Sequence, residues 1–313
     1  TGLENAMALT DENGTATFTF KESAAGTFEP TFSAAGGSTT SSTVTVEEGD
    51  VRTYTREDGT ELTATYQGNG TVDNPYLIDS LADLQVIENS SSARADNYQL
   101  VADINASATT ESTWNSGSGF EPIATASGAT FTGSLDGNGH TISNLSVNRS
   151  GANSIGLVGE LGSTGVVQNL TIENTSIVGQ DDIGAAVGTS AGTIQNVTVS
   201  GTVDGNNRLG GVVGIVKTAG SVTDSTAAVN TSGSQRVGGL VGDSSGEVTR
   251  SSARGTVTAT GQYAGGLIGD HRSTIPVVDT NASGAVTGTG STGGLIGRAQ
   301  ANVTDSSASG RVN

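Results

Sequence analysis

The sequence predicts an all-β fold, a parallel β-helix with about 28 residues and three strands in each coil. A short apolar and glycine-rich phrase returns six times at nearly constant spacing in the second half of the chain. Glycine accounts for 47 of the 313 residues, whereas aromatic residues make up only 4%. Such a chain lacks the large side chains of an ordinary globular core. It can instead stack small and β-branched residues in regular layers.

The repeated phrase is an apolar residue, two small residues, two aliphatic residues and a closing glycine. The closing glycines are 29, 26, 28, 27 and 28 residues apart, at Gly159, Gly188, Gly214, Gly242, Gly269 and Gly297. The first copy has Ile155 where the others have their first glycine, and the second has Ala185 and Ala186 in place of Gly-Leu. A fixed period of this length indicates a solenoid, and glycine with β-branched residues favours strands over helices.

Other positions recur with the same period. An aliphatic column predicts a continuous stack inside the coils: Val167, Ile194, Val222, Val248, Val277 and Val303. A polar column follows two residues later: Asn169, Asn196, Asp224, Arg250, Asp279 and Asp305. The polar column is either an inner hydrogen-bonded asparagine ladder or a row of turn residues that face the solvent. A third column opens the last strand-sized piece of several coils: Gly201, Gly255, Gly284 and Gly310.

Residues 1–50 are expected to form a separate β-rich segment. The stretch 15–20 alternates threonine with apolar residues, a turn signal at Asn13-Gly14 precedes it, and 26–33 and 42–47 supply further strands. The residues at 9–18, followed by Gly-Thr-Phe at 26–28, resemble the last strands of bacterial Ig-like domains of the invasin type. The resemblance implies an Ig-like β-sandwich fragment. Either its earlier strands were removed or another chain completes it.

Residues 51–73 are expected to be a linker, and residues 74–130 an N-terminal cap for the β-helix. The cap contains short strands at 74–78 and 98–104 and one helix at about 81–89, for which Ser80 is the expected N-cap. Trp114, Phe120 and Ile123 follow in a loop. The first coil of a stack has no preceding coil to cover it, so larger apolar residues are expected there.

Residues 131–313 are expected to be the repeat array, which begins with a strand, a tight turn at Asp-Gly-Asn-Gly-His (136–140) and a second strand. The Gly-Gly-Leu-Val-Gly repeat and the lead-in from Asn74 resemble the GLUG-motif surface proteins of bacteria and archaea. The resemblance covers about 74–313. It implies export, a right-handed β-helix and a large surface protein that is often adhesin-like or protease-associated. It does not imply one activity.

The net charge of −18 argues against nucleic acid and anionic membranes as partners. Only Lys21 and Lys217 of the 13 basic residues are lysine. An acidic, lysine-poor chain suits high salt and favours a haloarchaeal source over an ordinary acidic secreted protein. Cysteine is absent, which excludes disulfides and thiolate sites. Because the chain starts at Thr1 and its last coil lacks a polar cap, we expect a part of a longer product with no membrane span of its own.

Twelve Asn-x-Ser/Thr sequons make the chain a candidate for glycosylation, although a chain rich in Ser, Thr and Asn also forms sequons by chance. They begin at Asn13, Asn69, Asn89, Asn105, Asn144, Asn148, Asn169, Asn174, Asn196, Asn230, Asn281 and Asn302.

Parallel β-helices also include polysaccharide lyases and glycosidases, so carboxylate and histidine side chains are possible catalytic groups. The carboxylate pair Asp181-Asp182, the group Asp136 with His140, and His271 are the candidates. Each is interpreted as part of a turn, so the prediction is no catalytic residue, no metal site and no cofactor. Weak Ca²⁺ or Na⁺ binding at acidic turns stays open.

These patterns favour a non-enzymatic, extracellular, structural or adhesive protein of the cell surface. Its expected partners are copies of itself, neighbouring surface proteins and glycans of other cells. A narrower hypothesis is a filament in which a neighbouring subunit supplies a strand to the N-terminal segment. The alternatives are a polysaccharide-degrading β-helix enzyme or viral tailspike, and a glycan-binding module without turnover.

Overall fold

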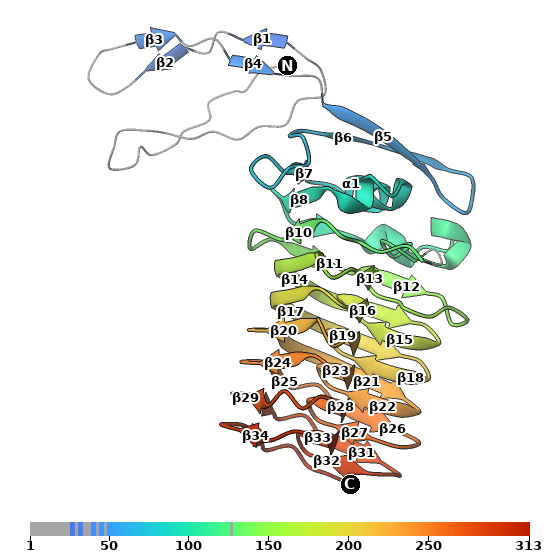
Figure 1. Cartoon of the computed structure of the whole chain (residues 1–313). Coiled ribbons are helices and arrows are strands. Elements are labelled where there is room, and N and C mark those ends of the chain that lie inside the picture. The colour runs from blue at the N-terminus through green and yellow to red at the C-terminus, as the bar shows by residue number, and fades with distance from the viewer. Residues whose placement is uncertain (1–25, 29–30, 34–38, 42–43, 47–48, 126–127) are drawn as a thin grey trace. The chain divides into compact units, whose positions relative to one another are not determined.

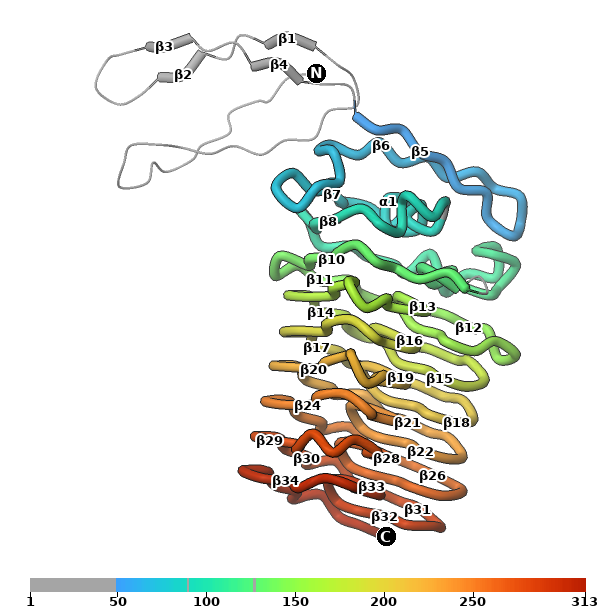
Figure 2. The backbone as a smooth tube through the Cα atoms, viewed as in Figure 1, coloured from blue at the N-terminus to red at the C-terminus, as the bar shows by residue number. Residues whose placement is uncertain are grey.

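The structure is a computed structural model that describes residues 26–28, 31–33, 39–41, 44–46, 49–125 and 128–313. The chain divides into two compact units, residues 1–50 and 51–313. The second unit is a parallel β-solenoid whose strands lie above one another in successive coils (Figures 1 and 2). This confirms the predicted parallel β-helix and its period, while the right-handed winding and the Ig-like sandwich fragment stay predictions.

Three parallel sheets form the walls of the solenoid, with eighteen, six and five strands. The eighteen-stranded broad sheet contains β7 (Tyr76–Ile78), β8 (Asn97–Leu100), β9 (Ile104–Asn105), β10 (Ser134–Asp136), β11 (Thr141–Ser143), β12 (Ser146–Asn148), β14 (Val166–Val178), β17 (Thr193–Asp204), β20 (Ser221–Thr223), β21 (Thr226–Gly233), β24 (Glu247–Thr249), β25 (Ser252–Ala253), β26 (Val257–Ala259), β29 (Val277–Val278), β30 (Asn281–Ala282), β31 (Val286–Gly288), β34 (Val303–Thr304) and β35 (Ser307–Ala308).

The other two sheets are narrower. The six-stranded sheet contains β13 (Val158–Leu161), β16 (Val187–Ser190), β19 (Val213–Val216), β23 (Val241–Ser244), β28 (Ile268–His271) and β33 (Ile296–Ala299). The five-stranded sheet contains β15 (Asp181–Gly184), β18 (Asn207–Gly210), β22 (Gln235–Gly238), β27 (Ala264–Gly265) and β32 (Thr292–Gly293).

The repeated phrase is two strands joined by a sharp arc. In the fourth copy, β22 ends at Gly238, Gly239 and Leu240 form the arc, and β23 begins at Val241. The stretch 236–242 therefore belongs to two sheets. The remaining two pieces of this coil form β24, β25 and β26 of the broad sheet. The prediction of three strands per coil is therefore wrong in number, because this coil contributes five short strands to the three sheets.

The first copy of the phrase is one residue short. Ile155 lies opposite Ile183 and Val158 lies opposite Val187. The first copy therefore has three steps between these columns where the second has four. The interpretation that Ile155 replaces the first glycine is wrong, because Ile155 occupies the aliphatic position that precedes it.

The aliphatic column forms the predicted internal stack. Val167 pairs with Ile194, Ile194 with Val222, and Val222 with Val248. The side chains are fully buried from Val167 through Val277, whereas Val303 in the last coil is 40% exposed. Like residues lie above like residues at the spacing of neighbouring strands, about 4.8 Å. Apolar burial therefore continues from coil to coil.

The polar column lies at a corner of the broad sheet. All six of its residues have positive φ, between 47° for Arg250 and 54° for Asp279. Asparagine and aspartate tolerate this left-handed conformation better than other residues except glycine. Asn196 is exposed and Asn169 is half-buried. The column is therefore a row of turn residues facing outward, but its asparagines also form a ladder, because the Nδ2 of Asn196 donates to the Oδ1 of Asn169 at 3.0 Å.

The glycine column marks places where two coils approach too closely for a side chain. A Cβ on Gly255 would lie 1.9 Å from the carbonyl oxygen of Val229, and one on Gly284 would lie 1.8 Å from that of Gly255. These obstacles are backbone atoms, which cannot rotate away. Glycine is therefore required in this column, because there is no room for a Cβ atom.

The turns between the six-stranded sheet and the broad sheet alternate in length. Five residues separate Leu161 from Val167, and three separate Ser190 from Ile194 in the next coil. Turns of five and then three residues follow in the next two coils, and the same two lengths follow again in the last two coils. Gly192 of a short turn lies beneath a long one, since its Cβ would be 2.2 Å from the carbonyl oxygen of Gly165.

The cap contains the predicted helix. α1 spans Leu81–Val86 and continues as a 3-10 turn at Ile87–Asn89. The Ser80 side chain accepts a hydrogen bond from the backbone N–H of Asp83 at 3.2 Å, which confirms the N-cap. Phe120 and Ile123 are fully buried, as expected for a cap. Further 3-10 turns are Ala93–Ala95, Ser107–Thr110 and Trp114–Gly117.

Residues 51–73 were expected to be a linker, but the structure shows a hairpin packed onto the cap. It consists of β5 (Asp50–Thr55) and β6 (Glu61–Tyr66). Tyr66 is fully buried and its hydroxyl donates to the carbonyl oxygen of Asp83 at 2.5 Å. Arg52 of β5 lies over the ring of Tyr76 at 4.7 Å, and Arg56, just after β5, lies over the ring of Trp114 at 4.5 Å. Cation–π contacts therefore help to fasten the hairpin.

The first unit contains two antiparallel strand pairs among its described residues. β1 (Gly26–Phe28) pairs with β4 (Val44–Val46), and β2 (Thr31–Ser33) pairs with β3 (Thr39–Ser41). The strand predicted at 15–20 and its turn at Asn13 lie outside the described residues.

Candidate functional site: a charged wall across the coils

Asp136 and His140 do not contact each other through any described hydrogen bond. Asp136 accepts hydrogen bonds from the Nδ2 of Asn169 at 3.1 Å and the Nε2 of Gln168 at 2.8 Å, both in the next coil. The Nδ1 of His140 lies 3.2 Å from Asp103 of the preceding coil. Hydrogen bonding to Thr141 and His140 holds the pKa of Asp103 below its ordinary value. Each of these groups ties one coil to another.

Asp181 and Asp182 are also bonded to the next coil. Asp182 contacts the Nε of Arg208, and Asp181 accepts from the backbone N–H of Asn207 at 3.1 Å. The hydrogen bond to Asp182 raises the pKa of Arg208. His271 is 1% exposed and donates through Nε2 to the carbonyl oxygen of Ile275 at 2.9 Å. Asp181 and Asp182 lie in strand β15 and His271 ends strand β28, so the interpretation of these residues as parts of turns is wrong. Their side chains nevertheless bond within the solenoid.

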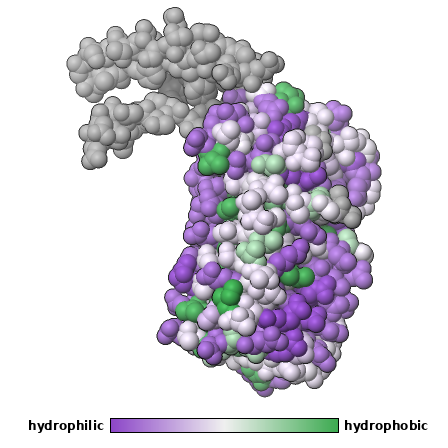
Figure 3. Space-filling view, viewed as in Figure 1, coloured by the Kyte–Doolittle hydropathy of each residue, from purple (hydrophilic) through white to green (hydrophobic). Residues whose placement is uncertain are grey.

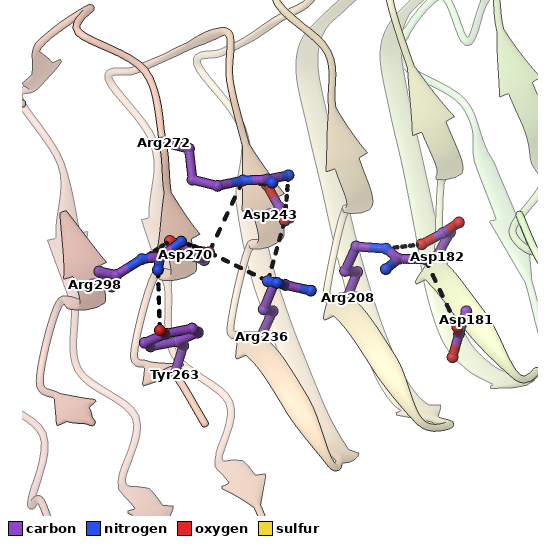
Figure 4. A network of polar contacts seen from close by, with 9 residues as sticks. All are labelled: Asp181, Asp182, Arg208, Arg236, Asp243, Tyr263, Asp270, Arg272 and Arg298. Carbon is purple, nitrogen blue, oxygen red and sulfur yellow. Dashed lines mark hydrogen bonds and ion pairs between the residues drawn. The ribbon is translucent and has the colours of Figure 1, made fainter. Parts of the chain in front are cut away.

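A charged network that the sequence analysis did not identify crosses the last three coils (Figure 4). Asp243 and Asp270 have no exposed side-chain surface. The guanidinium of Arg298 donates to both oxygens of Asp270, at 2.8 and 2.6 Å, and Arg236 donates to Asp270 at 3.2 Å. Arg272 donates to Asp243 at 2.9 and 2.7 Å.

Two columns of the coil produce this network. Asp243, Asp270 and Arg298 each follow the closing glycine of a phrase and lie opposite one another in register. Arg208, Arg236 and Tyr263 each precede the first aliphatic residue of a phrase and have positive φ. Arg298 reaches back to Tyr263, with its Nη1 3.0 Å from the phenol oxygen and its guanidinium 4.3 Å from the ring centroid. Extending the column analysis to these two positions could have found the network.

Burial dominates the electrostatics of Asp243. Desolvation raises the pKa of its carboxyl group, and the hydrogen bonds from Arg272 oppose this rise. The hydrogen bond to Asp270 raises the pKa of Arg298. Because neither buried carboxylate reaches solvent, a polymeric substrate cannot contact it. The network is thus suited to holding coils together and unsuited to acid–base chemistry on a glycan.

No group of three or more His, Cys, Asp or Glu side chains suited to a metal ion occurs among the described residues. In the same part of the chain, no helix combines the length and the apolar character needed to cross a bilayer.

Eight sequon asparagines are exposed and two are half-buried. The exposed ones are Asn69, Asn105, Asn148, Asn174, Asn196, Asn230, Asn281 and Asn302, and the half-buried ones are Asn144 and Asn169. The side chains of Asn13 and Asn89 lie outside the described part. A second ladder connects three of the ten, because Asn174 donates to Asn144 at 2.6 Å and Asn144 donates to Asn105 at 3.1 Å.

The comparisons with known proteins agree with the fold and with the predicted resemblance. The family model of the GLUG motif matches residues 288–313. Halomucin of Haloquadratum walsbyi is 69% identical over 281 residues, which is 89% of this chain and 3% of halomucin. A candidate Gly-rich membrane protein of Evansella cellulosilytica is 36% identical over 135 residues, which is 42% of this chain and 15% of that protein.

This chain therefore spans only a small part of the relatives that it matches. A crystal structure of a candidate immunoglobulin A1 protease from Bacteroides ovatus has a TM-score of 0.62 at 19% identity, over 76% of each chain. At this identity the similarity shows the fold alone.

Proposed function

This chain carries the GLUG motif on a parallel β-solenoid, and we propose that it is a non-enzymatic structural segment of an extracellular cell-surface protein. The observation that carries the proposal is the use of its acidic side chains. Asp136, Asp181, Asp182, Asp243 and Asp270 each contact a side chain or backbone group of a neighbouring coil. Side chains used in this way connect neighbouring coils of a rod.

Similarity to halomucin and to a candidate membrane protein supports a location at the cell surface. The exposed sequons support a glycosylated surface, and the charge of −18 on a chain with two lysines supports a hypersaline setting. An adhesive role, with neighbouring surface proteins or glycans of other cells as partners, belongs to the same proposal.

A sugar-release assay tests the non-enzymatic proposal. The native protein and the variants Asp136→Asn, Asp181→Asn and Asp182→Asn are incubated with surface glycans, and new reducing ends are measured. We expect no release from any of the four proteins. Release by the native protein that one variant abolishes would establish the polysaccharide-degrading alternative. Binding to a glycan array without release would establish the glycan-binding alternative.

A narrower proposal is a filament in which residues 1–50 accept a strand from another subunit. Its support is that the described strands of this unit form two separate antiparallel pairs, and a sandwich of the Ig type needs about seven strands. Electron microscopy of the native assembly tests it. Separate particles with an independently ordered N-terminal unit would contradict it.

A further inference from the structure

The sequons are distributed unevenly around the solenoid. Nine of the ten with described side chains lie in or directly beside strands of the broad sheet, and Asn69 lies between β6 and β7. The described strands of the five-stranded and six-stranded sheets contain none. Glycans attached at these sequons would therefore cover the broad sheet and leave the other two sheets bare.

The bare side has an ordered arrangement of charge, which we call the charged wall. It consists of Glu160, Asp181, Asp182, Arg208, Lys217, Arg236, Asp243, Asp270, Arg272 and Arg298. Its five acidic and five basic residues cancel, although the whole chain carries −18. This wall is consequently the side on which two copies of the chain repel each other least.

The charges of the wall are also separated along the solenoid axis. The first two coils, which contain β13, β15 and β16, contribute three carboxylates and no basic side chain: Glu160, Asp181 and Asp182. Their ion pairs reach only to the coil that follows, to Arg208 and, at 3.8 Å, to Lys217. The four coils that follow contribute five basic side chains and the two fully buried carboxylates. The outermost basic groups are accessible, since Arg272 is 42% and Arg298 36% exposed.

We propose that two copies of this chain associate through their charged walls in antiparallel orientation. A two-fold axis perpendicular to the solenoid axis, in the plane of contact, places the first coil of one copy opposite the last coil of the other. Glu160 then faces the region of Arg298, and Asp181 and Asp182 face that of Arg272. Parallel pairing would instead oppose like charges, which disfavours it.

The contact is modest in size and polar. Six strands at about 4.8 Å and a width of roughly six strand residues give an area near 600 Å² on each copy, at the lower end of specific interfaces. On the face shown in Figure 3, hydrophilic residues border a band of intermediate residues that contains several apolar ones. Association is therefore expected to be weak and reversible, and strongest where many copies are held close together.

Cysteine cross-linking tests the orientation, because the chain has no cysteine of its own. Ser163→Cys and Gln300→Cys place single thiols at exposed turn positions beside β13 and β33. When the two full-length variants are mixed and oxidised, we expect the mixed disulfide dimer to exceed either homodimer. The control pair Glu173→Cys and Ser309→Cys, exposed on the broad sheet, should form no preferred mixed dimer. The proposal would be overturned if the homodimer of Ser163→Cys or of Gln300→Cys exceeded their mixed dimer. It would also be overturned if the control pair formed its mixed dimer to the same extent as these two variants.

Sedimentation equilibrium at about 1 M NaCl, where the Debye length is about 3 Å, tests the surface without a cross-link. Glu160→Lys should raise the dissociation constant about tenfold, because two symmetric contacts become repulsive. Glu173→Lys makes the same change of net charge on the broad sheet and should leave the constant unchanged. A monomer under all conditions, or equal effects of the two variants, would contradict the inference. The inference rests on the proposed structural role, but its failure leaves the sugar-release result unaffected.

Discussion

Replacing Gly255 with alanine should destabilise the solenoid strongly. The new Cβ would lie 1.9 Å from the carbonyl oxygen of Val229, whereas ordinary contacts begin at 3.4 Å. The two coils would have to separate by about 1.5 Å (3.4 − 1.9). The hydrogen bonds nearest the clash are Arg254 N to Ala227 O at 2.8 Å and Thr231 N to Thr256 O at 2.9 Å.

The expected cost follows from these contacts. Each of the two hydrogen bonds contributes about 1 kcal/mol, and overpacking adds about 1–3 kcal/mol. We therefore expect a loss of about 3 kcal/mol or more in the free energy of unfolding, measured by urea unfolding at constant salt with circular dichroism. Because a solenoid can unfold in parts, the midpoint at each wavelength should be compared. Gly151 is the matched control, since a Cβ there meets nothing within 4 Å and its φ is not positive. An unchanged midpoint for Gly255→Ala would refute the reasoning.

Three further predictions use the same unfolding measurement. Ile194→Val should cost about 0.5–1.5 kcal/mol of unfolding free energy, because Ile194 is fully buried. Val303→Ala should cost less than the same substitution at a buried valine of the aliphatic column, and equal costs would contradict the internal stack. The hydrogen bonds from Arg250 lower the pKa of Asp224. The ionised Asp224 side chain therefore stabilises the fold above the ordinary aspartate pKa, and this stabilisation is lost as the pH falls through the lowered pKa. When unfolding is measured over a series of pH values, Asp224→Asn should lack this pH-dependent loss of stability. Burial raises the pKa of Asp243, so its ionisation destabilises the fold as the pH rises through the raised value; a steeper decline in Asp243→Asn than in the native protein would contradict this.

The sequence determined the fold because the same physical requirement recurs in every coil. The aliphatic column at Val167 and Ile194 and the glycine column at Gly255 and Gly284 report burial and close approach directly. A single coil would not have shown them. The two strands within the repeated phrase are harder to separate from the sequence, because the arc between them, at Gly239 and Leu240, contains no polar turn residue. The chain can reverse its direction at this arc because glycine lacks a Cβ and so lets two backbone segments approach closely.

The charged network was harder to predict because its partners are far apart in sequence. Arg236 and Asp270 are 34 residues apart, and Tyr263 and Arg298 are 35 apart. These separations exceed one period, since one partner precedes a phrase and the other follows the next phrase. The hairpin β5–β6 was mistaken for a linker for a related reason. Its first strand places Arg52 inward, where it binds through a cation–π contact. The apolar alternation of Leu62, Ala64 and Tyr66 on the inner face of β6 was overlooked.

The alternation of long and short turns sets the unit by which such a protein can grow. Because Gly192 of a short turn lies beneath the long turn of the preceding coil, a duplicated or deleted single coil would bring two long or two short turns together. A pair of coils, such as the 55 residues from Leu161 to Ile215, can be inserted or lost with every junction preserved, because Val216 takes the place of Leu161. Gene duplications in steps of two coils would therefore extend the rod without disturbing the turns at which coils meet.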